Sequence, residues 1–130
     1  MKTKADIEAY LLRTDLRFHE LSDCMWVISG AGNAEQIVLK LAPPVLVCRV
    51  HVMDAPKDRR EDCFKTLLEL NAAEMVHGAY GLEGDKIVVS GALELENLDY
   101  NEFQATLDDV VLAVANHYPR LASFRGAAAA

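Results

Sequence analysis

The segment HGAYGLEGDKIVV, from His77 to Val89, has glycines at a regular spacing of three residues and a lysine close behind them. Glycine-rich loops bind phosphate where they lead from a strand into a helix, because backbone N–H groups and the helix dipole then meet the anion. Here the glycines lead into a strand-like run, and Glu83 and Asp85 place negative charge on both sides of Gly84. The segment therefore predicts a β-hairpin with a Gly84-Asp85 turn, in which glycine supplies positive φ, rather than a nucleotide site.

Two groups of residues have side chains that bind metal ions in other proteins. Cys48 and His51 have the spacing C-x-x-H, but residues three apart in a strand point to opposite faces and cannot chelate one ion. The second group lies across a predicted turn, its spacing matches no strong zinc pattern, and it consists of His19, Glu20, Asp23 and Cys24. We therefore predict no metal site, and a solvated polar turn at residues 19–24.

The nucleophiles and carboxylates form no recognisable catalytic arrangement. Asp108 and Asp109 are adjacent in a predicted helix, where consecutive side chains diverge by about 100°. A serine nucleophile of the hydrolase type sits in a G-x-S-x-G turn, and none of the serines does so: Ser22, Ser29, Ser90 and Ser123. We predict that the protein is not an enzyme, with no catalytic residue and no cofactor.

The charge of the chain restricts its partners. Its 130 residues carry a formal net charge of -7, which disfavours binding to nucleic acid or to anionic membranes. No apolar run is long enough for a membrane span or a secretory signal, and Cys24, Cys48 and Cys63 are an odd number of thiols. These features predict a cytoplasmic protein with reduced cysteines.

The N-terminal half predicts one helix followed by strands. Thr3 and the aspartate three positions later form a capping box for a helix to about residue 13. Residues 17–21 and 25–29 predict a hairpin. Residues 36–53 are rich in Val, Ile and Leu and predict two strands, or one long strand that Pro43-Pro44 interrupts.

In the second part of that segment apolar residues alternate with others, as in a strand with one buried face. The side that we predict to be core carries Leu46, Cys48, Val50 and Val52, and the other side carries Val47, Arg49 and His51.

The C-terminal half predicts a helix, a hairpin and a second helix. Asp58, with Glu61, is predicted to cap a helix through residue 73. Residues 76–82 and 86–95 predict the hairpin strands, and Asp99, with Glu102, begins a helix that Pro119 ends. The order α-β-β-β-α-β-β-α predicts an α+β fold, an antiparallel sheet with helices packed against it. We expect one domain over residues 1–125 and an Ala-rich tail at 126–130.

More apolar residues are present than the core plainly needs, which allows for protein interfaces. For any one of these residues, ordinary core packing is the competing interpretation. We predict a client-binding surface formed by Tyr10, Phe18, Trp26, Val38, Val47 and Met53. We predict a dimer interface formed by Phe64, Leu68, Met75, Val76 and Tyr80.

Three segments resemble the YbjN family, whose fold is similar to that of class I type III secretion chaperones, including the Tir chaperone. They are LLELN (67–71), GAYGLEGDKIVV (78–89) and LDYNEFQATLDDVVLAVANHYPRL (98–121). The resemblance implies an α-β-β-β-α-β-β-α domain and a small acidic homodimer that holds an extended client over apolar patches. It implies no residues for chemistry.

Two further functions remain open at this point. YbjN-like proteins are described as sensory-transduction regulators, and such a regulator would act through a signalling partner or through a small ligand in a closed pocket lined by Trp26 or His51. A hydrolase or metal enzyme would require the cluster at residues 19–24 to converge with another polar residue.

Overall fold

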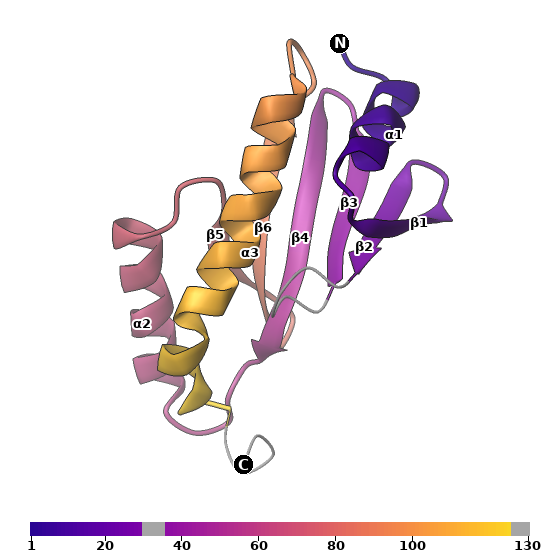
Figure 1. Ribbon diagram of the computed structural model, residues 1–130. Helices are drawn as coiled ribbons and strands as arrows, with labels where there is room; N and C mark the ends of the chain where they lie inside the picture. The colour runs from indigo at the N-terminus through magenta and orange to yellow at the C-terminus, as the bar shows by residue number, and fades with distance from the viewer. Residues whose placement is uncertain (30–35, 126–130) are drawn as a thin grey trace.

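Residues 1–29 and 36–125 are described by the computed structural model, and the predicted tail at 126–130 lies outside them. In this part of the chain three helices and six strands follow one another (Figure 1): α1 (Lys4–Arg13), β1 (Arg17–Ser22), β2 (Met25–Ser29), β3 (Gln36–Ala42), β4 (Val45–Asp54), α2 (Arg60–Ala73), β5 (Ala79–Glu83), β6 (Lys86–Glu94) and α3 (Tyr100–Ala122). The α+β class is confirmed. Four strands precede α2, because residues 36–53 form two strands that separate at Pro43-Pro44.

Two of the three predicted helix caps are present. The Thr3 N–H donates to Asp6 Oδ2 at 2.8 Å, and the Asp6 N–H returns a bond to Thr3 Oγ1. The carboxylate of Asp99 accepts from the N–H of Glu102 at 2.7 Å. The predicted cap at Asp58 is wrong. The N-cap of α2 is Arg59, which has a φ of 57° and no side-chain cap bond. Its guanidinium lies 4.7 Å from the centre of the Phe124 ring, a tertiary contact that local sequence does not reveal.

The prediction that α3 ends before Pro119 is also wrong, because the helix continues to Ala122. Proline removes one N–H donor from the helix ladder, which costs stability. Leu121 and Phe124, just beyond it, are both buried in the core. Their burial offsets the lost hydrogen bond.

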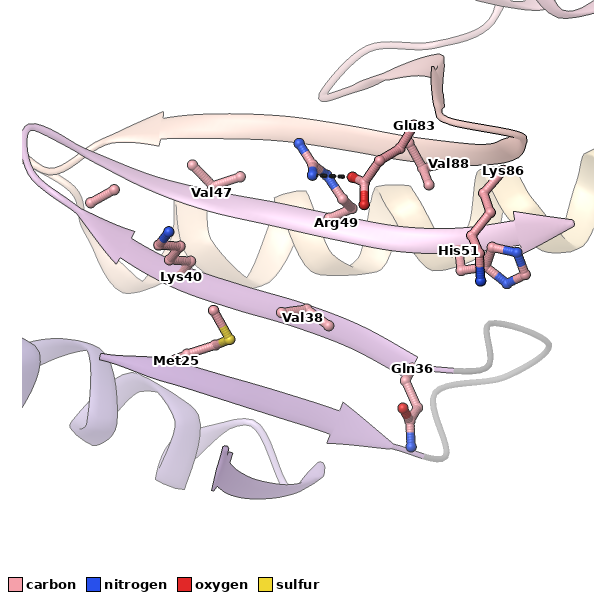
Figure 2. A pocket seen from close by; sticks show the side chains of 11 residues that line it. Met25, Gln36, Val38, Lys40, Val47, Arg49, His51, Glu83, Lys86 and Val88 are labelled. Atoms are coloured by element: carbon pink, nitrogen blue, oxygen red, sulfur yellow. Dashed lines mark hydrogen bonds and ion pairs between the residues drawn. The ribbon is translucent and has the colours of Figure 1, made fainter. Parts of the chain in front are cut away.

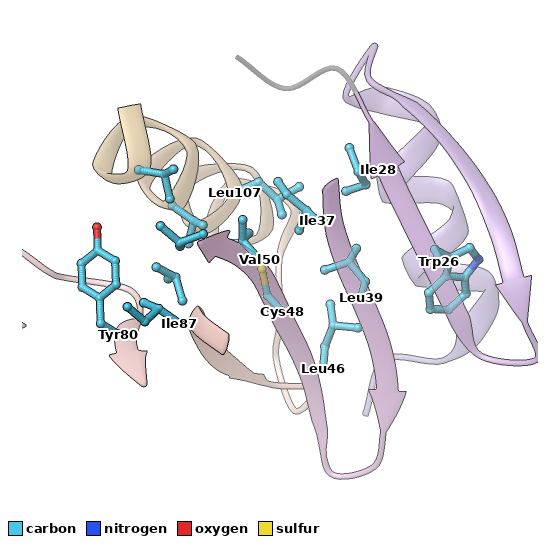
Figure 3. Packing of buried hydrophobic residues seen from close by; sticks show 14 of the residues in the cluster. Trp26, Ile28, Ile37, Leu39, Leu46, Cys48, Val50, Tyr80, Ile87 and Leu107 are labelled. Carbon is cyan, nitrogen blue, oxygen red and sulfur yellow. The ribbon is translucent and has the colours of Figure 1, made fainter. Parts of the chain in front are cut away.

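The strands form one antiparallel sheet in the order β1-β2-β3-β4-β6-β5, so β1 and β5 are its edges. In Figure 1, α1 and α3 lie across one face of the sheet, and α2 lies beside α3 near β5. Side chains from this face and from the helices make a single buried cluster (Figure 3). Its strand members include Trp26 paired with Leu39, and Ile28 paired with Ile37.

A bulge in β4 changes the expected alternation of its last residues. His51 pairs with Val88, but Met53 pairs with Ile87, so Val52 is an extra residue between them. Two consecutive side chains, Val52 and Met53, are therefore both buried on the helix side. The next residue, Asp54, returns to the exposed face.

The predicted hairpin at residues 77–89 is present. Glu83 pairs with Lys86 across a two-residue turn, and Gly84 has a φ of +61°. Gly91 in β6 serves a different purpose, because a Cβ there would lie 2.5 Å from the carbonyl oxygen of His77. Gly91 therefore allows the segment before β5 to pack closely against β6.

Replacing Gly91 with alanine should destabilise the protein by about 1–3 kcal/mol, because a backbone carbonyl must move to admit the methyl group. Gly81→Ala is the matched control, since no atom lies within 4 Å of a Cβ at that position. We expect the control to change stability by less than about 0.5 kcal/mol. Urea unfolding followed by circular dichroism measures both, and equal stability of the two variants would contradict this account.

Candidate protein-binding surfaces

The face of the sheet that points away from the helices is the first candidate. Figure 2 shows its side chains projecting from the strands, with α3 behind the sheet. They line an open hollow of about 1110 Å³. We call this surface the outer face, and its lining residues are Met25, Gln36, Val38, Lys40, Ala42, Val47, Arg49, His51, Glu83, Lys86 and Val88.

Two predicted client-binding residues, Val38 and Val47, lie together at the centre of the outer face. In the register of β3 and β4, Val38 is opposite Arg49 and Val47 is opposite Lys40. Both valines are half-buried. Valine and cation therefore alternate along each of the two strands, and each valine lies opposite a cation of the neighbouring strand.

Sequence reasoning missed Met25 and Val88 as apolar members of the outer face. Val88 is flanked by Ile87 and Val89, and an unbroken apolar run does not reveal which residue points to which face. The pairing of Val88 with His51 assigns it to the outer face. Met25 is the first residue of β2, so no preceding strand residue shows by alternation which face its side chain takes.

The other predicted client-binding residues lie elsewhere. Tyr10 and Phe18 are half-buried on the helix side, and the Tyr10 hydroxyl donates to the carbonyl of Leu98 at 2.7 Å. The expectation that Trp26 and Met53 are partly exposed is wrong. Trp26 is fully buried among the inward-facing side chains, and the bulge turns Met53 into the core.

The residues predicted for the dimer interface also include both exposed and buried side chains. Leu68 on α2 and Val76 after it are 68% and 74% exposed, so both can contact another molecule. Phe64 and Met75 are half-buried against the core. Tyr80 is buried, which corrects the expectation of a surface position.

The Tyr80 side chain makes polar contacts within the chain. Its hydroxyl lies 2.7 Å from Nδ1 of His117, whose Nε2 is 3.4 Å from Oε1 of Glu74. Burial, and secondarily the Glu74 carboxylate, raises the pKa of Tyr80 to about 12, so the hydroxyl keeps its proton at neutral pH. This chain of polar contacts ties β5 to α3 and to the end of α2.

Asn71 on α2 bonds the backbone of Tyr80, the second residue of the edge strand β5. Its Oδ1 accepts from the backbone N–H of Tyr80 at 2.7 Å, and its Nδ2 donates to the Tyr80 carbonyl at 3.2 Å. An edge strand normally leaves such groups available to a further strand. We call this pair of bonds the Asn71 clasp. Among the described residues, no side chain holds the backbone of the other edge strand, β1, in this way.

The candidate metal ligands do not converge. Cys48 is in the core and His51 lines the outer face, so they point to opposite sides of β4 as predicted. Over residues 1–29 and 36–125, no three His, Cys, Asp or Glu side chains are grouped to hold an ion. Burial raises the pKa of the Cys48 thiol to about 12, which makes it a poor nucleophile. No helix in these ranges is long and apolar enough to span a membrane.

Comparison with known proteins identifies a family. The family model CesT_Tir_1 matches residues 1–127 of the chain. No curated protein matches the sequence.

Several solved structures share the fold. A chain of the heterodimeric ExoU–SpcU complex from the type III secretion system of Pseudomonas aeruginosa superposes with a TM-score of 0.70 at 13% identity, covering 87% of this chain and 95% of that one. A chain of the ExsC–ExsE complex gives 0.69 at 18% identity, covering 98% and 99%. YbjN from E. coli gives 0.68 at 12% identity, covering 92% and 93%. The resemblance noted from the sequence is thereby confirmed at the level of fold.

The Asn71 clasp predicts a protected amide at Tyr80. In Asn71→Ala both bonds are lost, and we expect hydrogen exchange at the Tyr80 N–H to accelerate about tenfold, the equivalent of one neutral hydrogen bond. In Asn71→Asp the oxygen that accepts from this N–H is kept, so protection there should largely remain. Exchange read by NMR separates the two, and Asn101→Ala on the exposed side of α3 is the control. Unchanged exchange in Asn71→Ala would show that the clasp does not hold the edge.

Proposed function

The chain belongs to the CesT_Tir_1 family of type III secretion chaperones, and on that premise we propose that it is a non-enzymatic domain that binds a partner or client polypeptide. Two of the structures with the same fold are protein complexes, ExoU–SpcU and ExsC–ExsE. The single observation that carries the proposal on this chain is the outer face. It presents apolar side chains on a sheet whose other face the helices already cover.

The outer face supplies binding free energy through apolar contact. Each Å² of apolar surface removed from water contributes about 25 cal/mol, before the cost of ordering the client. Val38 and Val47 line the hollow from β3 and β4, the two central strands of the sheet, and a bound segment that crosses these strands would cover both side chains. We therefore retain these two residues, of the six predicted from the sequence, as the main client contacts.

An extended client can also add to the edge of a sheet through main-chain hydrogen bonds. The Asn71 clasp occupies the backbone N–H and C=O of Tyr80 on β5, two of the groups that such a strand would need. The β1 edge carries no comparable clasp in the described part of the chain. Strand addition, where it accompanies binding, is thus favoured at β1, next to α1.

We further propose a homodimer whose contacts include Leu68 and Val76. These are large, exposed apolar side chains, one on α2 and one between α2 and β5. Because Asn71 already bonds the backbone of Tyr80, we expect this interface to form through side-chain packing rather than through main-chain hydrogen bonds at Tyr80. Phe64 and Met75 lie partly exposed on the same helix and connecting segment, and belong to the same proposal.

The alternative function, a regulator that binds a small ligand, has less support. It required a closed pocket lined by Trp26 or His51, whereas Trp26 is buried in the core and His51 lines an open hollow. A single domain over residues 1–125, a cytoplasmic location and a role in secretion remain predictions.

Capture from a lysate of the native cell tests client binding. A Val38→Asp, Val47→Asp double variant should lose the proteins that the wild type retains, because two carboxylates replace the apolar centre of the outer face. Leu112→Asp is the matched control, since that side chain is 59% exposed on α3. Mass spectrometry identifies the bound proteins, and thermal melting verifies that both variants fold. Identical captures by the wild type and the double variant would remove the outer face from the proposal.

Light scattering at micromolar concentration tests the dimer. The wild type should have twice the 14.3 kDa mass of one chain. Leu68→Asp with Val76→Asp should give a monomer, because burying two carboxylates in an apolar interface is costly. Leu12→Asp, at a position that is 73% exposed on α1, should leave the dimer intact. A monomeric wild type would reject the dimer, and a dimeric double variant would place the interface elsewhere.

A further inference from the structure

The outer face differs in charge from the rest of the molecule. Among its lining residues, Lys40, Arg49 and Lys86 are cationic and Glu83 is the single carboxylate, a formal charge of +2 on a chain that carries -7. Asp54 lies at the Lys86 end of this face. The centre, by contrast, has Lys40 and Arg49 next to Val38 and Val47. A ligand that covers this centre meets apolar surface and positive charge together.

Glu83 comes from the edge of the sheet to pair with Arg49. The two residues lie on β5 and β4, which β6 separates, and Glu83 Oε2 accepts a hydrogen bond from the Arg49 guanidinium across that strand (Figure 2). Their side chains are 58% and 48% exposed, respectively. Exposed ion pairs contribute little to stability, so little free energy is lost if another carboxylate takes the place of Glu83.

From this arrangement we propose that the outer face selects an extended polypeptide segment whose sheet-facing side chains, at every second residue, alternate between carboxylate and apolar, and that Glu83 holds the Arg49 guanidinium until a client carboxylate replaces it. The inference rests on the proposed function and specifies the chemistry of the client. Valine and cation lie two residues apart on each of β3 and β4, which is the spacing of side chains that share one face of an extended segment. Positive charge at the centre disfavours a basic segment of the same shape.

A polypeptide fits this surface better than the other possible occupants. Pockets for small molecules bury about 70–90% of the ligand, whereas the hollow is open and extends over strands β2 to β6. A second copy placed face to face around a two-fold axis through the region of Lys40 and Arg49 would bring these cations against their own counterparts. An acidic segment avoids both difficulties.

Labelled peptides of roughly ten residues, the length of a long strand, provide the test. One carries valine and glutamate in turn at every second position, with neutral polar residues between them, and its counterpart has lysine in place of glutamate. We expect the wild type to bind the glutamate peptide more tightly, with affinity that falls as salt is added, in fluorescence anisotropy. Equal affinity for the two peptides, or no binding of the glutamate peptide, overturns the charge selection. Lysate capture that depends on Val38 and Val47 would still support the proposed function in that case.

Single substitutions then separate the roles of the charges. Lys40→Gln and Arg49→Gln should each weaken binding of the glutamate peptide by about two- to fivefold, the range of one exposed ion pair. Glu83→Gln should instead strengthen binding by a similar factor, because it frees the guanidinium. Lys65→Gln on the exposed side of α2 is the control and should change nothing.

Two results would assign the face to another occupant. Competition by free glutarate at the same carboxylate concentration would indicate a small-anion site. Loss of the dimer in Lys40→Gln would indicate a second copy. Either result, or a Glu83→Gln variant that binds no more tightly than the wild type, overturns the proposal.

Discussion

The alternation of side chains across a sheet that has helices on one face only is the constraint on which this structure depends. Each strand must supply apolar residues to the helix side, and the buried cluster that includes Trp26, Ile28, Leu39 and Cys48 follows from that requirement. The residues between them are then forced onto the opposite face, whatever their chemistry. A surface with both valines and cations is a direct result, because Val38 and Lys40 share one strand with the core residues Ile37 and Leu39.

Local chemistry made much of the fold predictable. The capping pairs at Thr3 and Asp99 and the glycine turn at Gly84 depend on residues close in sequence, and all three are present. The errors occurred where a distant contact decides the local structure. Arg59 begins α2 with its guanidinium against the Phe124 ring, and α3 continues past Pro119 to residues whose side chains are buried.

The interface residues were harder to predict, because an apolar side chain looks the same in a sequence whether it is covered or exposed. Val38, Val47, Leu68 and Val76 have accessible surface, whereas Trp26 and Tyr80 do not. The informative polar residue was also hidden. Asn71 recurs at the spacing of a packed helical face, and only the position of β5 beside that helix gives its amide a role.

The bulge in β4 has a consequence for how the chain tolerates changes in length. Elsewhere in this strand, inserting or deleting one residue exchanges the two faces and moves an entire apolar set into water. At Val52 the ladder already contains an unpaired residue, so a deletion there leaves Met53 opposite Ile87 and Asp54 opposite Lys86. A relative of this chain that is one residue shorter at this point would lose the Val52 side chain from the core, but every other residue of the strand would keep its face.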